Sequence, residues 1–157
     1  MQEGQLAPDV ELPVANIESI LPGSGDKKTL KLSDLRGHNV VLFFFPWAMT
    51  PVCTAEACAF RDWQAEFKAL GAIVLGVSTD SLDRQQKFTS TKQLNYPLLS
   101  DSDKVIARQF DVLNMFGLAR RSTFVIDKNG VIVKIYKSVG RMDTHPEKVL
   151  EFLKTLK

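Results

Sequence analysis

The fold is decided by one stretch, Asn39-Val-Val-Leu-Phe-Phe-Phe45 followed directly by Pro46-Trp-Ala-Met-Thr50-Pro-Val-Cys53-Thr-Ala-Glu-Ala-Cys58. Its first seven residues are almost continuously apolar, without the alternation of a half-exposed strand, which predicts a strand covered on both faces. From Thr50 onward, Phe60, Trp63, Phe67 and Leu70 recur at three- and four-residue steps, which predicts a helix to about Leu70. A buried strand that runs through a short loop into a helix is typical of an α/β sheet.

The rest of the chain continues this alternation of strands and helices. We expect a strand or hairpin at Val10–Ile17 and strands at Ala72–Val77, Tyr96–Leu99, Thr123–Ile126 and Val131–Tyr136. We expect helices at Leu82–Lys92, at Lys104–Phe110 and from about His145, and a loop at residues 21–26. Asp127-Lys-Asn-Gly130 predicts a hairpin turn, with Gly130 in a left-handed position. The pattern therefore predicts a central mixed β-sheet flanked by helices on both faces, with a site beyond the carboxyl ends of its strands.

Length and composition narrow the class of protein. The 157 residues suit a single domain over residues 1–157, and a formal charge of +2 without a dense Lys/Arg patch argues against nucleic-acid binding. The longest apolar run, Val40–Met49, is much shorter than the roughly 20 residues of a membrane helix. The N-terminus lacks the features of a signal peptide, so we expect a cytoplasmic protein. His38 and His145 lie far from the cysteines in sequence, so we expect solvated or capping histidines and no metal site.

Cys53 and Cys58 are the only cysteines in the chain. A disulfide across four intervening residues closes a very short loop and would stabilise the fold little, so redox chemistry is the better interpretation. Thr50 followed by Pro51 predicts a helix start, with the Thr50 hydroxyl as a cap and Cys53 in the first turn. There the positive end of the helix dipole favours a thiolate, the nucleophilic form of cysteine.

The spacing of the two cysteines adds a mechanical prediction. In a regular helix, Cα atoms five residues apart are about 8.7 Å from each other. A disulfide needs a Cα separation of roughly 4.4–6.8 Å. Cys53 and Cys58 can therefore be thiols in an intact helix or a disulfide in an opened one, and we predict that oxidation unfolds the first turns of this helix.

The residues resemble those of the peroxiredoxin family. Pro46, Thr50 and Cys53 match its Pro-x-x-x-Thr-x-x-Cys signature, and Cys58 stands where the bacterioferritin-comigratory-protein, or peroxiredoxin Q, branch has its resolving cysteine. The similarity covers nearly the whole chain. It extends to Leu32-Ser-Asp-Leu-Arg-Gly37, Phe60-Arg-Asp62, Gly76-Val-Ser-Thr-Asp-Ser81, Leu98-Leu-Ser-Asp101 and Arg121-Ser-Thr-Phe-Val-Ile-Asp127.

This resemblance implies a thioredoxin-like fold and a thiol peroxidase that reduces hydrogen peroxide and organic hydroperoxides. Cys53 would form a sulfenic acid, and Cys58 would resolve it to an intramolecular disulfide. Thr50 would orient the peroxide and the thiolate, while Pro46 would shield the pocket from water. Arg121 would stabilise the thiolate and the transition state, with neighbouring Arg120 as the alternative. Glu56 would hold the arginine or the local backbone.

The resemblance further implies thioredoxin as the reductant, with glutaredoxin as an alternative, no cofactor, and a monomer, with a dimer as the alternative. Two other functions are open. A thioredoxin-type disulfide reductase usually has two residues between its cysteines, and the resemblance to thioredoxin would call for a cis-proline where this chain has Arg121-Ser-Thr. A holdase or redox-sensing protein would bind partners without turnover. Peroxide consumption coupled to thioredoxin separates the three.

Overall fold

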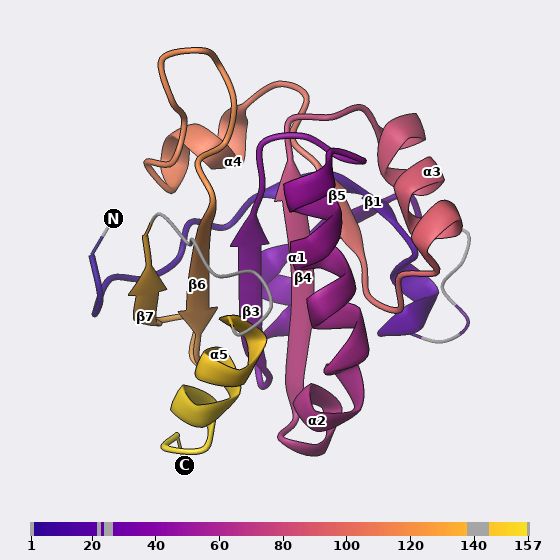
Figure 1. Ribbon diagram of the computed structural model, residues 1–157. Helices are drawn as coiled ribbons and strands as arrows, with labels where there is room; N and C mark the ends of the chain where they lie inside the picture. The colour runs from indigo at the N-terminus through magenta and orange to yellow at the C-terminus, as the bar shows by residue number, and fades with distance from the viewer. Residues whose placement is uncertain (1, 22, 24–26, 138–144, 157) are drawn as a thin grey trace.

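The computed structural model describes residues 2–21, 23, 27–137 and 145–156. Its centre is a seven-stranded mixed sheet in the order β2-β1-β5-β4-β3-β6-β7 (Figure 1). The strands are β1 (Glu11–Ala15), β2 (Thr29–Lys31), β3 (Asn39–Phe44), β4 (Ala72–Ser78), β5 (Leu98–Ser100), β6 (Ser122–Ile126) and β7 (Ile132–Tyr136). The parallel strands β3, β4 and β5 lie at its middle, and the other neighbours pair antiparallel.

Helices cover both faces of this sheet, as the sequence predicts. One face packs against α1 (Pro51–Asp62), α2 (Gln64–Ala69), α3 (Leu82–Lys92) and α5 (His145–Leu153), and the other against α4 (Val105–Gln109) and the short 3-10 helices η1 (Ile17–Ser19) and η2 (Leu32–Leu35). Alternate side chains of β3 enter the two cores: Phe43 lies with Phe60 of α1, and Phe44 lies with Phe110. The apolar, non-alternating sequence of β3 follows from this double burial.

Strand register brings three distant segments to one end of β3. Because β3 and β4 are parallel and pair Phe44 with Val77, both strands end at the same edge of the sheet. Strand β6 runs antiparallel to β3 and pairs Ser122 with Phe44, so β6 begins where β3 ends. The loop that leaves β3 therefore meets the turn after β4 and the residues that lead into β6, as expected for a site beyond strand ends.

The expected elements are present with shifted bounds. The helix predicted to Leu70 is two helices, α1 and α2, because Trp63 leaves helical geometry with ψ 9°. Strand β2 is not predicted from the sequence, because it has three residues and only Leu30 among them is buried. The predicted hairpin turn is confirmed, with Gly130 at φ +84° and its N–H donating to the Asp127 carbonyl. Most of the loop predicted at 21–26 lies outside the described residues.

The two histidines differ in their surroundings. His38 is exposed, but His145 is buried, with its Nε2 2.8 Å from the Thr123 hydroxyl and its ring edge-on to Phe60 and Tyr136. Burial lowers the pKa of His145 to about 4. A solvated or capping role is therefore wrong for His145, which is a neutral core residue between α1, β6 and α5. The sequence offered no local sign of this, because the residues that bury it are distant along the chain.

Candidate active site

The site begins in the loop of residues 45–50 between β3 and α1. Thr50 is the N-cap residue of α1 and Pro51 is its first helical residue, as predicted. The predicted capping bond is wrong: the Thr50 hydroxyl makes no bond to the helix N–H groups and instead donates to the Trp47 carbonyl at 3.0 Å. Met49 has a left-handed φ of 68°, and this tight turn brings the Trp47 carbonyl within reach of the hydroxyl.

Cys53 lies in the first turn of α1, as expected, and is only 2% exposed. Its backbone N–H has no hydrogen-bond partner among the described residues, as is usual for the first N–H groups of a helix. Cys58 lies further along the same helix and is half-buried, and both cysteines are free thiols. This is the reduced, helical state of the two that the spacing permits.

Arg121 joins Cys53 to the rest of the site. It directly precedes β6, and its Nη2 donates to the Cys53 Sγ at 3.4 Å while its Nη1 donates to Glu56 Oε1 at 3.0 Å. Burial works to lower the pKa of Arg121, but the hydrogen bond to Cys53 and the charge of Glu56 outweigh it, so the pKa is raised and the guanidinium stays charged. A fixed positive charge beside the sulfur favours the thiolate.

Glu56 is a buried acid behind this contact. Its side chain is fully buried, and Oε2 has no hydrogen-bond partner within the described part of the chain. Burial raises the pKa of Glu56 to about 7, although Arg121 acts in the opposite direction. Arg121 is thus shared between a carboxyl group that is only partly charged at neutral pH and the sulfur of Cys53.

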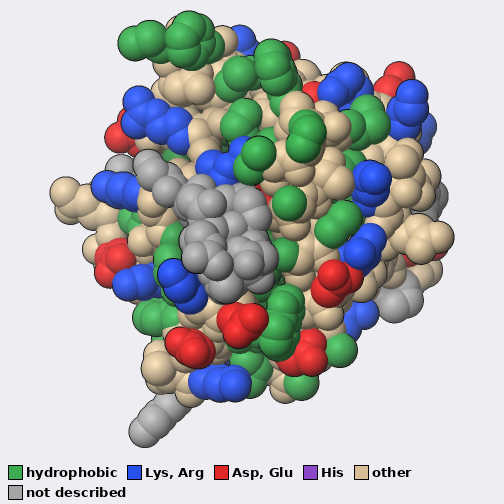
Figure 2. Space-filling view, in the orientation of Figure 1, with side chains coloured by type: hydrophobic (Ala, Val, Ile, Leu, Met, Phe, Trp, Pro, Cys, Tyr) green, Lys and Arg blue, Asp and Glu red, His purple; other side chains and the backbone are tan. Residues whose placement is uncertain are grey.

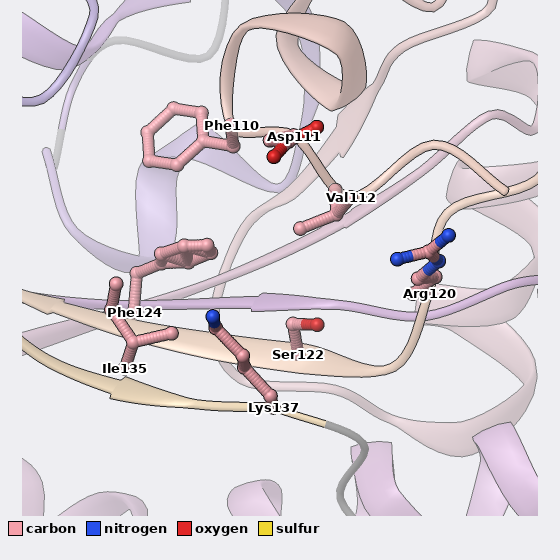
Figure 3. A pocket seen from close by; sticks show the side chains of 8 residues that line it. All are labelled: Phe110, Asp111, Val112, Arg120, Ser122, Phe124, Ile135 and Lys137. Carbon is pink, nitrogen blue, oxygen red and sulfur yellow. The ribbon is translucent and has the colours of Figure 1, made fainter. Parts of the chain in front are cut away.

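The neighbouring Arg120 has different surroundings. It lines a cavity of about 150 Å³ with Phe110, Val112, Ser122 and other residues (Figure 3). Ser122 and Phe124 of β6 also line this cavity. They alternate along the strand with Thr123 and Val125, and Val125 belongs to the core that contains Cys53. The cavity therefore lies on the face of the sheet opposite Cys53. Of the two candidate arginines, the one in contact with Cys53 is Arg121.

The end of the molecule near this loop has an apolar surface. Seen from the side of α1, hydrophobic side chains gather where β3 runs into the helix (Figure 2). Two large hydrophobic side chains that flank the site in sequence, Trp47 and Val52, are 52% and 53% exposed. Thr50, which lies between them, and Pro46, which directly precedes Trp47, are half-buried. The loop that leads to the buried Cys53 therefore carries exposed apolar side chains.

Sequence reasoning missed three side chains that surround the site. Asp80 and Arg84 bind the backbone of Ala48 in the loop, and Tyr96 binds the backbone of α1. A usable signal existed for Asp80, because it follows the carboxyl end of a strand expected beside β3. Tyr96 carries no such signal, since the sequence alone places it inside a strand.

Among the described residues, no three His, Cys, Asp or Glu side chains gather in a way that could hold a metal ion. None of the helices found there combines the length and the apolar character needed to cross a membrane.

Comparison with known proteins places this geometry in a family. The AhpC/TSA family model matches residues 4–135. Peroxiredoxin Bcp of Bacillus subtilis is 41% identical over 98% of this chain and 94% of its own length. Chloroplastic peroxiredoxin Q of Gentiana triflora is 39% identical over 83% of this chain and 61% of its own length.

Solved structures agree with the sequence relatives. Peroxidoxin BcpB of Mycobacterium tuberculosis is 38% identical and superimposes with a TM-score of 0.86, covering 100% of this chain and 99% of its own. A bacterioferritin comigratory protein of Xanthomonas campestris, studied for its alkyl peroxide reduction activity, is 30% identical with a TM-score of 0.81, covering 92% and 90%. The chain has the thioredoxin-like fold of these proteins and belongs to the AhpC/TSA family of peroxiredoxins, in the branch of Bcp and peroxiredoxin Q.

Proposed function

We propose that the protein is a thiol peroxidase in which Cys53 attacks hydroperoxides, Cys58 resolves the product, and thioredoxin restores both thiols. The observation that carries this proposal is the contact between Arg121 and Cys53 at the start of α1. A helix N-terminus and a guanidinium both favour negative charge at one buried sulfur. The membership of the peroxiredoxin family supports the same chemistry.

In the first step, the Cys53 thiolate attacks the terminal oxygen of the hydroperoxide. An S–O bond forms and the O–O bond breaks; the terminal oxygen keeps its proton, and the leaving alkoxide or hydroxide takes up a proton from solvent and departs as an alcohol or water. Cys53 becomes a sulfenic acid, oxidised by two electrons. Arg121 and the free N–H of Cys53 are the donors placed to stabilise the charge that develops on oxygen.

The hydrogen bond of Thr50 suggests how the substrate is oriented. Its only hydroxyl proton is donated to the Trp47 carbonyl, so the Thr50 oxygen is left as an acceptor. An organic hydroperoxide carries one donor, the O–H on its terminal oxygen. We expect that O–H to donate to Thr50, which would direct the terminal oxygen toward the sulfur, while Pro46 limits the access of water.

In the second step, Cys58 resolves the sulfenic acid. Its sulfur attacks the sulfenic sulfur of Cys53, a disulfide forms, and the sulfenic oxygen leaves as water. The helix must open for this step, because two residues five apart in a helix are about 8.7 Å apart at Cα. A thioredoxin dithiol then reduces the disulfide by exchange and is itself oxidised. The proposed cycle uses side chains of this chain, without a cofactor or metal.

The setting of the cycle follows from the same residues. Trp47 and Val52 supply an apolar surface near the site, which supports organic hydroperoxides as substrates beside hydrogen peroxide. Both cysteines lie on one helix, so the cycle needs no second copy, and we expect a monomer. A free, close cysteine pair suits the reducing cytoplasm.

The test is peroxide consumption coupled to thioredoxin and its reductase, measured for the wild type, Cys53→Ser and Cys58→Ser. We expect Cys53→Ser to lose turnover. Cys58→Ser should consume one equivalent of peroxide and then stop, because thioredoxin has no disulfide to reduce. Full activity of Cys53→Ser would refute the proposal. Thioredoxin-dependent disulfide reduction without peroxide consumption would favour the reductase, and binding without turnover the holdase.

A further inference from the structure

A buried acid, Asp80, and its partner Arg84 lie beside the site and have no part in the proposed catalytic cycle. Asp80 follows β4, and its side chain is 3% exposed. Arg84 lies in the first turn of α3, is 49% exposed, and places its Nε 2.8 Å from Asp80 Oδ1. A buried carboxylate held by a single half-exposed arginine gains little stability from the ion pair itself. Its other contacts give it a more specific role.

Asp80 and Arg84 hold both backbone groups of one loop residue. The Ala48 N–H donates to Asp80 Oδ2 at 2.7 Å, and the Ala48 carbonyl accepts from Arg84 Nη2 at 2.8 Å. The acid, the arginine and the Ala48 backbone thus form a closed ring of hydrogen bonds, which we call the Ala48 clamp. It joins the turn after β4 to the loop after β3, at the edge where both strands end.

The clamp is itself held in place. Asp80 Oδ2 also accepts from the Ser78 hydroxyl, and the Asp80 carbonyl accepts from the Ser100 hydroxyl at 2.6 Å. Gln85 donates to the Ser78 hydroxyl oxygen at 2.9 Å and to the Leu99 carbonyl at 2.8 Å. Strands β4 and β5 and helix α3 therefore fix the acid, and the acid fixes the loop.

The loop has a reason to need this support. Met49, which follows Ala48, has a left-handed φ of 68°, a conformation that costs a residue with a side chain on the order of 1 kcal/mol. Thr50 comes next, and its hydroxyl donates to the carbonyl of Trp47, the residue before Ala48. Ala48 is therefore inside the turn that sets the position of the Thr50 oxygen, and the clamp is attached at that residue.

We propose that Asp80 and Arg84 are positioning residues, which hold the loop so that Thr50 meets a hydroperoxide above Cys53. The inference rests on the proposed peroxidase function and extends it to a second layer of residues. Loss of the clamp would leave Arg121 and the start of α1 in place, because neither contacts Asp80 or Arg84 through any hydrogen bond found in the described residues. Peroxide reactivity would then fall while general thiol reactivity stays.

Two variants break the clamp in different ways. Asp80→Asn keeps the shape, but one acceptor oxygen becomes an NH₂ donor that faces either the Ala48 N–H or Arg84 Nε. Arg84→Lys keeps the charge, but one ammonium cannot replace the two nitrogens that bind Asp80 and Ala48. Asp101→Asn is the matched control: Asp101 is a buried acid that accepts from two backbone N–H groups of α4, Ile106 and Ala107, away from the loop.

The readout is the ratio of two rates in a Cys58→Ser background, the oxidation of Cys53 by a hydroperoxide and its alkylation by iodoacetamide. We expect both clamp variants to lower this ratio by about 10–100-fold, since a misplacement near 1 Å can cost that much. Asp101→Asn should lose stability and keep the ratio. A wild-type ratio in Arg84→Lys would overturn the inference, and this variant decides the question if Asp80→Asn does not fold.

Amide hydrogen exchange separates the clamp from the chemistry. We expect the Ala48 N–H to exchange faster in Arg84→Lys than in the wild type, whatever the substrate is. Unchanged exchange of the Ala48 N–H in Arg84→Lys would overturn the clamp and leave the proposed peroxidase function standing. A wild-type Cys53 that does not react with any hydroperoxide would instead overturn the proposed function.

Discussion

The two halves of α1 are held in different ways. In the first half, residues 51–56, the side-chain bonds to other described parts of the protein come from Arg121, and Pro51 and Val52 are exposed. In the second half, residues 57–62, three hydrogen bonds tie the helix to the segment before β5. Tyr96 donates to the Ala57 carbonyl at 2.6 Å, Asn95 donates to the Arg61 carbonyl at 3.2 Å, and Arg61 donates to the Lys92 carbonyl at 2.7 Å.

The largest fully buried side chain of α1 also lies in the second half. Phe60, in the second half, is fully buried, with its ring stacked on Phe43 at 4.6 Å between centroids. Cys53 thus lies in the less strongly anchored half, and Cys58 lies one residue past the Tyr96 anchor at Ala57. Segments with few buried contacts open first. We therefore expect α1 to open from its N-terminus and to stop opening near Ala57.

The largest expected effect is on amide exchange after oxidation. With one equivalent of hydroperoxide, the amides of residues 54–57, which are the first in α1 to have helical hydrogen bonds, should exchange at least about 100-fold faster, equivalent to about 2.7 kcal/mol of lost protection. The amides of residues 60–62 should keep most of their protection, because their anchors do not involve Cys53. The measurement is hydrogen exchange of the reduced and oxidised protein, resolved by residue.

Cys58→Ser treated with the same peroxide is the control, since it forms no intramolecular disulfide and should stay helical. Identical protection in the reduced and oxidised wild type would contradict the opening of the helix. Loss of protection through α2 would contradict the boundary at Ala57.

The two halves of α1 show which features the sequence can predict and which depend on long-range contacts. Periodicity and the Thr50-Pro51 start predict a helix that contains both cysteines, and the helical distance alone predicts that it must open. Those are local properties. Where the opening stops depends on Tyr96, which meets Ala57 across 39 residues of chain, and the geometry of Thr50 depends on Asp80. Contacts of this kind arise from strand register, which one sequence does not reveal.

Glu56 is expected to make the first half sensitive to pH. Its pKa is raised to about 7 in the folded protein, above its ordinary value of 4.5, so the folded state holds the proton more tightly than the unfolded chain. The contribution of Glu56 to stability is therefore full below about pH 4.5 and is lost as the pH rises through about 7. In a Cys53→Ser background, Glu56→Gln should remove this loss, on the order of 2 kcal/mol.

Urea unfolding of both proteins at pH 5 and pH 8 measures this difference. Glutamine keeps an oxygen that can accept from Arg121, so the change removes the titration more than the contact. Glu66→Gln, at an exposed position of α2, serves as the control and should leave the pH dependence as it is. The same pH slope in Glu56→Gln and its parent would show that the buried acid does not titrate in this range.

The smallest expected effect is the most direct test of the anchor. Tyr96→Phe deletes one hydroxyl from a fully buried side chain and should cost about 1 kcal/mol of unfolding free energy, the usual value of one hydrogen bond. Tyr136→Phe is the matched control, because its hydroxyl reaches the Lys148 carbonyl only at 3.4 Å in an exposed setting, and its loss should be close to zero. Equal losses would argue against a special role for Tyr96. If Tyr96 sets the boundary, amide protection in oxidised Tyr96→Phe should also fall beyond Ala57, so that the turn around Cys58 opens together with the turn around Cys53.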